Sequence, residues 1–102
     1  MKDFKLYLDK ELQIPAGDPI ELGKLKAGET KKYKYYIYNS SVFPYEELKY
    51  DFNVANVKVL QAPDELLEKR SAEFIIEWKP KVDVEKGLKT TLEIDGYFAI
   101  KG

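Results

Sequence analysis

The 102-residue chain has no cysteine and no histidine, which excludes disulfides, thiolate metal sites and every catalytic arrangement built on an imidazole. Its 17 basic and 18 acidic side chains leave a net charge of -1, whereas proteins that bind nucleic acid usually carry a basic excess that neutralises phosphates. The length fits a single domain spanning residues 1–102, large enough to bury a core without covalent staples. Arg70 is the one arginine beside many lysines, and this Lys/Glu enrichment with few amides is typical of a thermophile protein.

No apolar run of signal-peptide length opens the chain, and no window approaches the roughly 20 apolar residues of a membrane-spanning helix. We therefore expect a cytoplasmic or virion protein that has no contact with a membrane. Nothing in the sequence points to a cofactor or to a small-molecule substrate.

Apolar and polar residues alternate with period two along most of the chain, which indicates half-buried β-strands. The first expected strand covers residues 4–8, and the Pro and Gly residues of 15–19 break it. A short second strand begins at Ile20, and residues 26–29 read as a turn.

Residues 31–39 (KKYKYYIYN) form the strongest predicted strand, rich in aromatic and β-branched side chains. The odd positions are expected to face the core, because they hold Ile37 and lack the two interior lysines. They are Tyr33, Tyr35 and Ile37. The even positions would then face outward: Lys32, Lys34, Tyr36 and Tyr38.

The second half of the chain predicts four further pieces. Strands are expected over residues 48–54, 57–61 and 72–78, and Pro80 ends the last of these because it cannot donate to a ladder. Asp64 is expected to cap one helical turn that places Leu66 and Leu67.

Residues 81–86 then read as a charged connection, Gly87 as a turn, and residues 88–100 as one long final strand. About seven strands at regular turn spacings predict an all-β fold, an immunoglobulin-like antiparallel β-sandwich, with an all-β barrel as the alternative. The expected core is Leu6, Leu22, Tyr35, Ile37, Phe52, Val54, Val59, Phe74, Ile76, Trp78, Leu92, Ile94, Phe98 and Ile100.

Three short motifs resemble those of immunoglobulin-like domains of the abnormal-spindle, hydin and major-sperm-protein type. Residues 20–25 (IELGKL) lead into a Gly-containing turn, Asn39 ends a strand before two serines, and Trp78-Lys79-Pro80 closes a later strand. The resemblance spans residues 20–102. It implies a sandwich that works as a structural or protein-binding module and not as a catalyst.

The outward face of the 31–39 strand is the sharpest candidate binding surface. Lys32, Lys34, Tyr36 and Tyr38 would line it, with Tyr45 and Tyr50 nearby. Aromatic rings interleaved with lysines can stack on bases or sugars while the ammonium groups hold phosphate. The alternative is an ordinary solvated sheet face, in which Tyr pairs across strands and Lys guards against aggregation.

Other candidate sites are weaker. Asp83, Glu85 and Asp95 could supply oxygen ligands to calcium, but their spacing matches no known calcium loop, so we expect no metal. Asn39 stands in a glycosylation pattern that we take as coincidental, because we expect no signal sequence, and the family resemblance implies a turn role for this residue. A leucine-bearing corner at residues 63–70 (PDELLEKR) could dock into a partner, although such corners more often bury their leucines internally.

These observations predict a non-catalytic structural or assembly module that acts by protein–protein contact through a sheet face or a sheet edge. Its partner would be another protein or a second copy of the chain, and nucleic acid is not expected as a ligand. By analogy of architecture, a virus or phage particle is one setting for such a module, as a decoration, tail or fibre part. A carbohydrate- or nucleic-acid-binding module that uses the 31–39 face is the alternative, and a small hydrolase is a remote third.

Overall fold

The computed structural model describes residues 3–98, and in this range it consists of β-strands and loops with no helix. It has eight strands: β1 (Phe4–Tyr7), β2 (Ile20–Leu25), β3 (Lys31–Asn39), β4 (Tyr45–Phe52), β5 (Val57–Gln61), β6 (Ser71–Trp78), β7 (Val84–Thr90) and β8 (Leu92–Phe98). No helix within residues 3–98 has the length and apolar character needed to cross a membrane.

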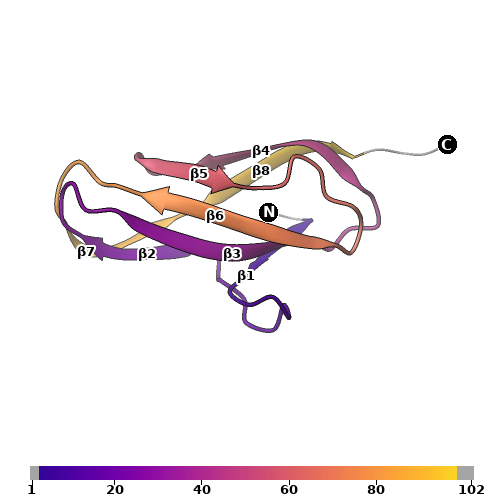
Figure 1. The fold of residues 1–102 in the computed structure, drawn as a ribbon, viewed down its shortest axis with the longest axis horizontal. Coiled ribbons are helices and arrows are strands. Elements are labelled where there is room, and N and C mark those ends of the chain that lie inside the picture. The colour runs from indigo at the N-terminus through magenta and orange to yellow at the C-terminus, as the bar shows by residue number, and fades with distance from the viewer. Residues whose placement is uncertain (1–2, 99–102) are drawn as a thin grey trace.

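Four strands form one sheet in the order β1-β3-β6-β5, while β2–β7 and β4–β8 form two separate two-stranded ladders (Figure 1). Every pairing is antiparallel. The prediction of an all-β fold with antiparallel sheets is therefore confirmed.

The alternation of β3 decides which of its faces is buried. Tyr35, Ile37 and Asn39 are at most 3% exposed, whereas the lysines at even positions point to solvent. The partner strand β6 buries Phe74, Ile76 and Trp78 in the same way. Because side chains alternate across a strand, both strands present one apolar face to the core, as the sequence predicts.

The β4–β8 ladder packs across this face. The Tyr50 ring meets the Phe74 ring edge-on at a centroid distance of 4.9 Å, and the Phe52 ring lies 6.4 Å from the same ring. The expected core residues that are buried are Leu6, Leu22, Tyr35, Ile37, Phe74, Ile76, Trp78 and Leu92. Those that pack against the core while only half-buried are Phe52, Val54, Val59 and Ile94.

Phe98 is the expected core residue that the structure contradicts, because its side chain is 51% exposed. It stands at the last position of β8, where the ladder ends and nothing in residues 3–98 covers it fully. Ile100, the other expected core residue at this end, lies outside the described residues. The core also includes four side chains that the sequence analysis did not select: Phe4, Ile20, Leu48 and Leu66.

The predicted final strand is two strands that meet at Thr91. β7 pairs with β2, and β8 pairs with β4, so the chain changes its partner at this point. Asn53 Oδ1 stabilises the change, because it accepts hydrogen bonds from Thr90 Oγ1 and from the Thr91 amide, both at 2.9 Å. The strand also begins earlier than expected, at Val84, so Gly87 lies inside a strand and the prediction of a turn there was wrong.

The helical turn predicted from Asp64 is absent. Leu66 instead pairs with Tyr45 through two backbone hydrogen bonds of 2.9 and 3.0 Å, which makes an isolated antiparallel bridge. Leu66 is buried while Leu67 is 53% exposed, so the corner buries one leucine and not both. A bridge that tethers the β5–β6 loop to β4 explains why this segment stays extended.

The molecule is elongated, with principal extents of 51 × 26 × 19 Å. The β2–β3 turn, the start of β5 and the end of β6 lie at one end of the long axis (Figure 1). The start of β4, the β5–β6 loop and the end of β8 lie at the other end.

Candidate functional site

The predicted binding residues lie together on the outer face of β3, in the interior of the four-stranded sheet. They are Lys32, Lys34, Tyr36 and Tyr38, and all are exposed or half-buried. In register across from them, β6 places Glu77 opposite Lys32 and Glu73 opposite Tyr36. On the other side, β1 places Tyr7 opposite Tyr36.

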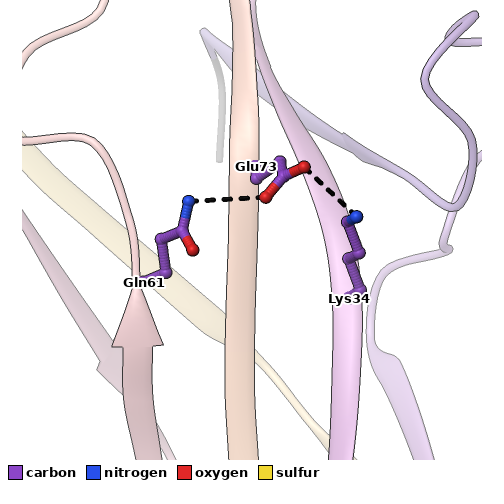
Figure 2. Close-up of polar contacts among 3 residues, drawn as sticks. All are labelled: Lys34, Gln61 and Glu73. Carbon is purple, nitrogen blue, oxygen red and sulfur yellow. Dashed lines mark hydrogen bonds and ion pairs between the residues drawn. The ribbon is translucent and has the colours of Figure 1, made fainter.

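Lys34 is engaged within the sheet and does not project freely. Its Nζ lies 3.1 Å from a carboxylate oxygen of Glu73, whose other oxygen lies 3.4 Å from the amide nitrogen of Gln61 (Figure 2). The ammonium also sits 5.7 Å from the Tyr36 ring centroid. The hydrogen bond to Glu73, followed by the contact with Tyr36, raises the pKa of Lys34. Glu73 thus links the outer edge of the sheet to its interior across three strands.

The outer face is close to charge-balanced. Glu73 and Glu77 stand among Lys32 and Lys34, so a phosphate approaching the lysines also meets two carboxylates. Tyr38 packs edge-on against Tyr7 with centroids 6.4 Å apart, which leaves both rings half-buried. This arrangement matches a solvated sheet face with cross-strand pairing more closely than a platform for stacking bases.

Tyr45 and Tyr50 do not lie near this face, so that part of the prediction was wrong. Both belong to β4, on the other side of the core. The Tyr50 hydroxyl donates to the Pro63 carbonyl oxygen at 2.8 Å, and burial raises its pKa strongly. The Tyr45 hydroxyl donates to the Asp3 carboxylate, and this hydrogen bond is the main reason that its pKa rises to about 12.

The three carboxylates weighed as a calcium site are not assembled into one. Asp83 accepts a hydrogen bond from the Ala27 amide at 2.8 Å, at the β2–β3 turn. Asp95 stands opposite Lys49 in the β4–β8 ladder. Within residues 3–98 no group of three or more His, Cys, Asp or Glu side chains could hold a metal ion.

A hollow of about 560 Å³ lies at the end of the molecule that holds the β2–β3 turn. Its charged lining consists of Lys58, Lys79, Lys81 and Glu77, and its remaining residues are Gly28, Asn56, Val57 and Pro80. We name it the basic hollow. It combines residues from three separated segments, so no spacing along the sequence could have revealed it.

A second hollow, of about 600 Å³, lies at the opposite end. Its charged lining consists of Glu46, Glu47, Asp64, Glu65 and Lys49, and Leu48 and Tyr97 complete it. We name it the acidic hollow. A β-bulge shapes it: Glu47 has a φ of 52° and the ladder register shifts between Glu46 and Lys49, which gathers acidic side chains from β4.

Two exposed aromatic rings lie at the same end as the acidic hollow. Phe43 and Phe98 have centroids 5.2 Å apart and are 41% and 51% exposed. The Tyr45 ring packs edge-on against the Phe98 ring, with centroids 6.0 Å apart. We name these two residues the aromatic pair. The alternation along β8 made Phe98 look like a core residue, and only the position of the ladder's end shows that it forms surface.

Comparison of the chain with models of protein families found no match. Neither the search of characterised proteins nor the search of solved structures found one.

Proposed function

We propose that this chain is a non-catalytic structural or assembly module that acts by protein–protein contact. The observation that carries the proposal is the aromatic pair, because two phenylalanine rings packed together at the end of a ladder are about half exposed. Contiguous exposed apolar groups on a small protein mark an interaction site, and aromatic residues are enriched in protein interfaces.

The surroundings of the aromatic pair support the same function. Val42, next to Phe43, is 70% exposed, and Tyr97, next to Phe98, is also 70% exposed and lines the acidic hollow. An apolar centre with a charged rim is the usual anatomy of a protein interface. A partner that covers the rings would remove apolar surface from water, while the carboxylates would orient it.

We also propose that the sandwich is immunoglobulin-like, of the type that the sequence motifs resemble. Two features of those motifs have structural roles that fit the proposal. Gly23 has a φ of 85° between two register shifts of the β2–β7 ladder, and Asn39 ends β3 with a buried side chain. The resemblance implies a structural or protein-binding module, and a virus or phage particle is the setting that we propose.

The alternative, carbohydrate or nucleic-acid binding through Lys32, Lys34, Tyr36 and Tyr38, has less support. Glu73 pairs with Lys34, and Glu77 stands opposite Lys32, so the face offers little attraction to phosphate. A glycan-array and oligonucleotide-binding assay with the Tyr36→Ser, Tyr38→Ser double variant addresses this alternative. Ligand binding that this variant loses without a change in melting temperature would favour it.

The test of the proposal is photo-crosslinking from benzoylphenylalanine placed at position 43. The probe is used in the purified chain and in extracts of the cells or particles that contain it. Conjugates with protein are expected, either with a second copy or with a foreign chain. The matched control carries the probe at Leu8, which is 51% exposed but belongs to the β1–β2 loop. Absence of conjugates at position 43, or equal conjugation at position 8, contradicts the proposal.

A further inference from the structure

Opposite charges gather at the two ends of this nearly neutral molecule. The basic hollow has three lysines and one glutamate, and the acidic hollow has four carboxylates and one lysine. Their volumes of about 560 and 600 Å³ are similar. With a net charge of -1 for the whole chain, the asymmetry is one of position and not of total charge.

These charges are not used inside the fold. Within residues 3–98 the only ion pair with atoms within 4 Å joins Lys34 and Glu73, which line neither hollow. The single glutamate of the basic hollow, Glu77, stands between Lys32 and Lys58 in register across the sheet. The positive excess of the basic hollow and the negative excess of the acidic hollow therefore remain available to a partner.

The end with the basic hollow also carries apolar surface. Val82, in the β6–β7 loop directly after Lys81, is 70% exposed, and the half-buried Val57 lines the hollow itself. The end with the acidic hollow carries the aromatic pair. Each hollow thus has apolar groups beside it, and the charges that line the two hollows are of opposite sign.

A third hollow, next to the basic hollow, does not cancel the difference in charge between the basic and acidic hollows. It is lined by Lys24 and Lys26 together with Glu29, Asp83 and Glu85, so its charges nearly cancel. The positive excess at this end is concentrated on the side formed by β5, β6 and the loop after β6. The electrostatic potential would therefore steer a negatively charged partner surface toward the basic hollow.

We propose that the partner is a second copy of this chain, which docks head to tail with its acidic end on the basic end of its neighbour. This inference rests on the proposed function, since it names the partner of the same contact surface. The elements that line the two hollows lie at opposite ends of a 51 Å axis (Figure 1). One molecule therefore carries both complementary surfaces, and a single type of contact suffices. A foreign polyanion would explain the basic hollow but neither the acidic hollow nor the aromatic pair.

A head-to-tail contact is heterologous, because the two touching surfaces differ. Such contacts repeat, and they give closed rings when the rotation between neighbours closes and open filaments when it does not. The contact is also salt-dependent, because exposed charges are screened within about 8 Å at physiological ionic strength. Both properties are measurable without knowledge of any other component.

The experiment is a charge swap followed by sedimentation velocity. One variant reverses the basic end with Lys79→Glu and Lys81→Glu, and a second reverses the acidic end with Glu46→Lys and Glu65→Lys. All four side chains are exposed, so the fold is expected to be retained. The matched control for the first variant, Lys10→Glu with Lys86→Glu, makes the same change in net charge as that variant at exposed positions that line neither hollow.

The wild type and the control are expected to associate more as concentration rises and less as salt is added. Each reversed variant alone is expected to sediment as the 11.9 kDa monomer, because like charges then meet. An equimolar mixture of the two reversed variants is expected to recover association, because the untouched acidic end of the first fits the untouched basic end of the second.

Three results would overturn the inference. If the reversed variants associate like the wild type while Phe98→Ser does not associate, the chain makes contact through the aromatic pair but does not dock head to tail. If the wild type is monomeric but still forms photo-conjugates with a foreign protein, the proposed function stands and the inference that the partner is a second copy is wrong. Heparin binding that is lost only in the Lys79→Glu, Lys81→Glu variant of a monomeric chain would assign the basic hollow to polyanions.

Discussion

Replacement of Asn39 by Ala tests how the loops at the acidic end are held. The side chain is fully buried, and its amide nitrogen donates to the Phe43 carbonyl oxygen at 2.8 Å and to the Leu66 carbonyl oxygen at 3.1 Å. Its carbonyl oxygen accepts from the Ser41 amide at 3.0 Å and from the Ser41 hydroxyl at 2.7 Å. One side chain therefore joins the β3–β4 loop, which carries Phe43, to the β5–β6 loop, which borders the acidic hollow.

The expected cost follows from these bonds. A typical intramolecular hydrogen bond contributes about 1 kcal/mol net, and a buried group left without a partner costs about 1–3 kcal/mol. Alanine at position 39 removes all four of these bonds, while the Leu66 and Phe43 carbonyl oxygens each keep a second donor, the Tyr45 amide and the Ser41 hydroxyl. We expect the free energy of unfolding to fall by about 3–4 kcal/mol on this basis. Because Phe43 is released, contact through the aromatic pair should weaken as well.

The assay is urea unfolding followed by Trp78 fluorescence, since this tryptophan is buried in the core. The matched control is Asn53→Ala, which also loses two accepted hydrogen bonds, from Thr90 Oγ1 and the Thr91 amide. Asn53 is exposed, so water can reach the Thr91 amide, and the buried Thr90 hydroxyl keeps a second acceptor, the Thr91 carbonyl oxygen at 3.2 Å. We therefore expect a cost of about 1 kcal/mol. Equal costs for the two variants, or a cost below about 1 kcal/mol for Asn39→Ala, would refute the reasoning that burial sets the value of this amide.

Two further predictions concern the packing and the tyrosines. Gly96→Ala should destabilise the fold by about 1–3 kcal/mol, because the added Cβ would lie 2.8 Å from Leu48 Cδ2 and 3.0 Å from the Glu46 carbonyl oxygen. In the control Gly87→Ala the added Cβ meets nothing closer than 3.8 Å, so this variant should be nearly neutral. Thermal unfolding of the two variants compares these costs. Burial raises the pKa of Tyr35 to about 12 from a usual value of 10.0, so the stability linked to this proton is fully present below pH 10 and is lost as the pH rises through 12. Absorbance at the tyrosinate band should therefore show late titration of Tyr35 coupled to alkaline unfolding, and ionisation of all eight tyrosines near pH 10 without unfolding would contradict this.

The sequence predicted the strands well wherever one face is buried and the other is wet. In β3 and β6 the two faces differ so clearly that the alternation alone places Ile37, Phe74 and Trp78 in the core. The alternation did not reveal where a strand changes its partner. The break at Thr91 depends on hydrogen bonds that Asn53, 38 positions earlier, accepts from Thr90 and Thr91, and period two continues through the break unchanged.

The sequence predicted correctly that the four candidate binding residues share one face, but it did not reveal which side chains lie beside them. Lys32, Lys34, Tyr36 and Tyr38 share one side of β3 because strand geometry requires it. The carboxylates that neutralise this side belong to β6, about 40 positions away, and their register could not be read from spacing. The two charged hollows escaped prediction for the same reason, since each is assembled from segments that meet only in the folded chain.

The most direct test of the account is the molar mass of the purified wild-type chain, measured by light scattering on a size-exclusion column over a wide range of concentration and salt. Contact through oppositely charged ends predicts a mass that rises above the 11.9 kDa of the monomer as concentration increases and falls back as salt is added. A mass that stays at 11.9 kDa at every concentration, at low salt as well as at high salt, would contradict the account.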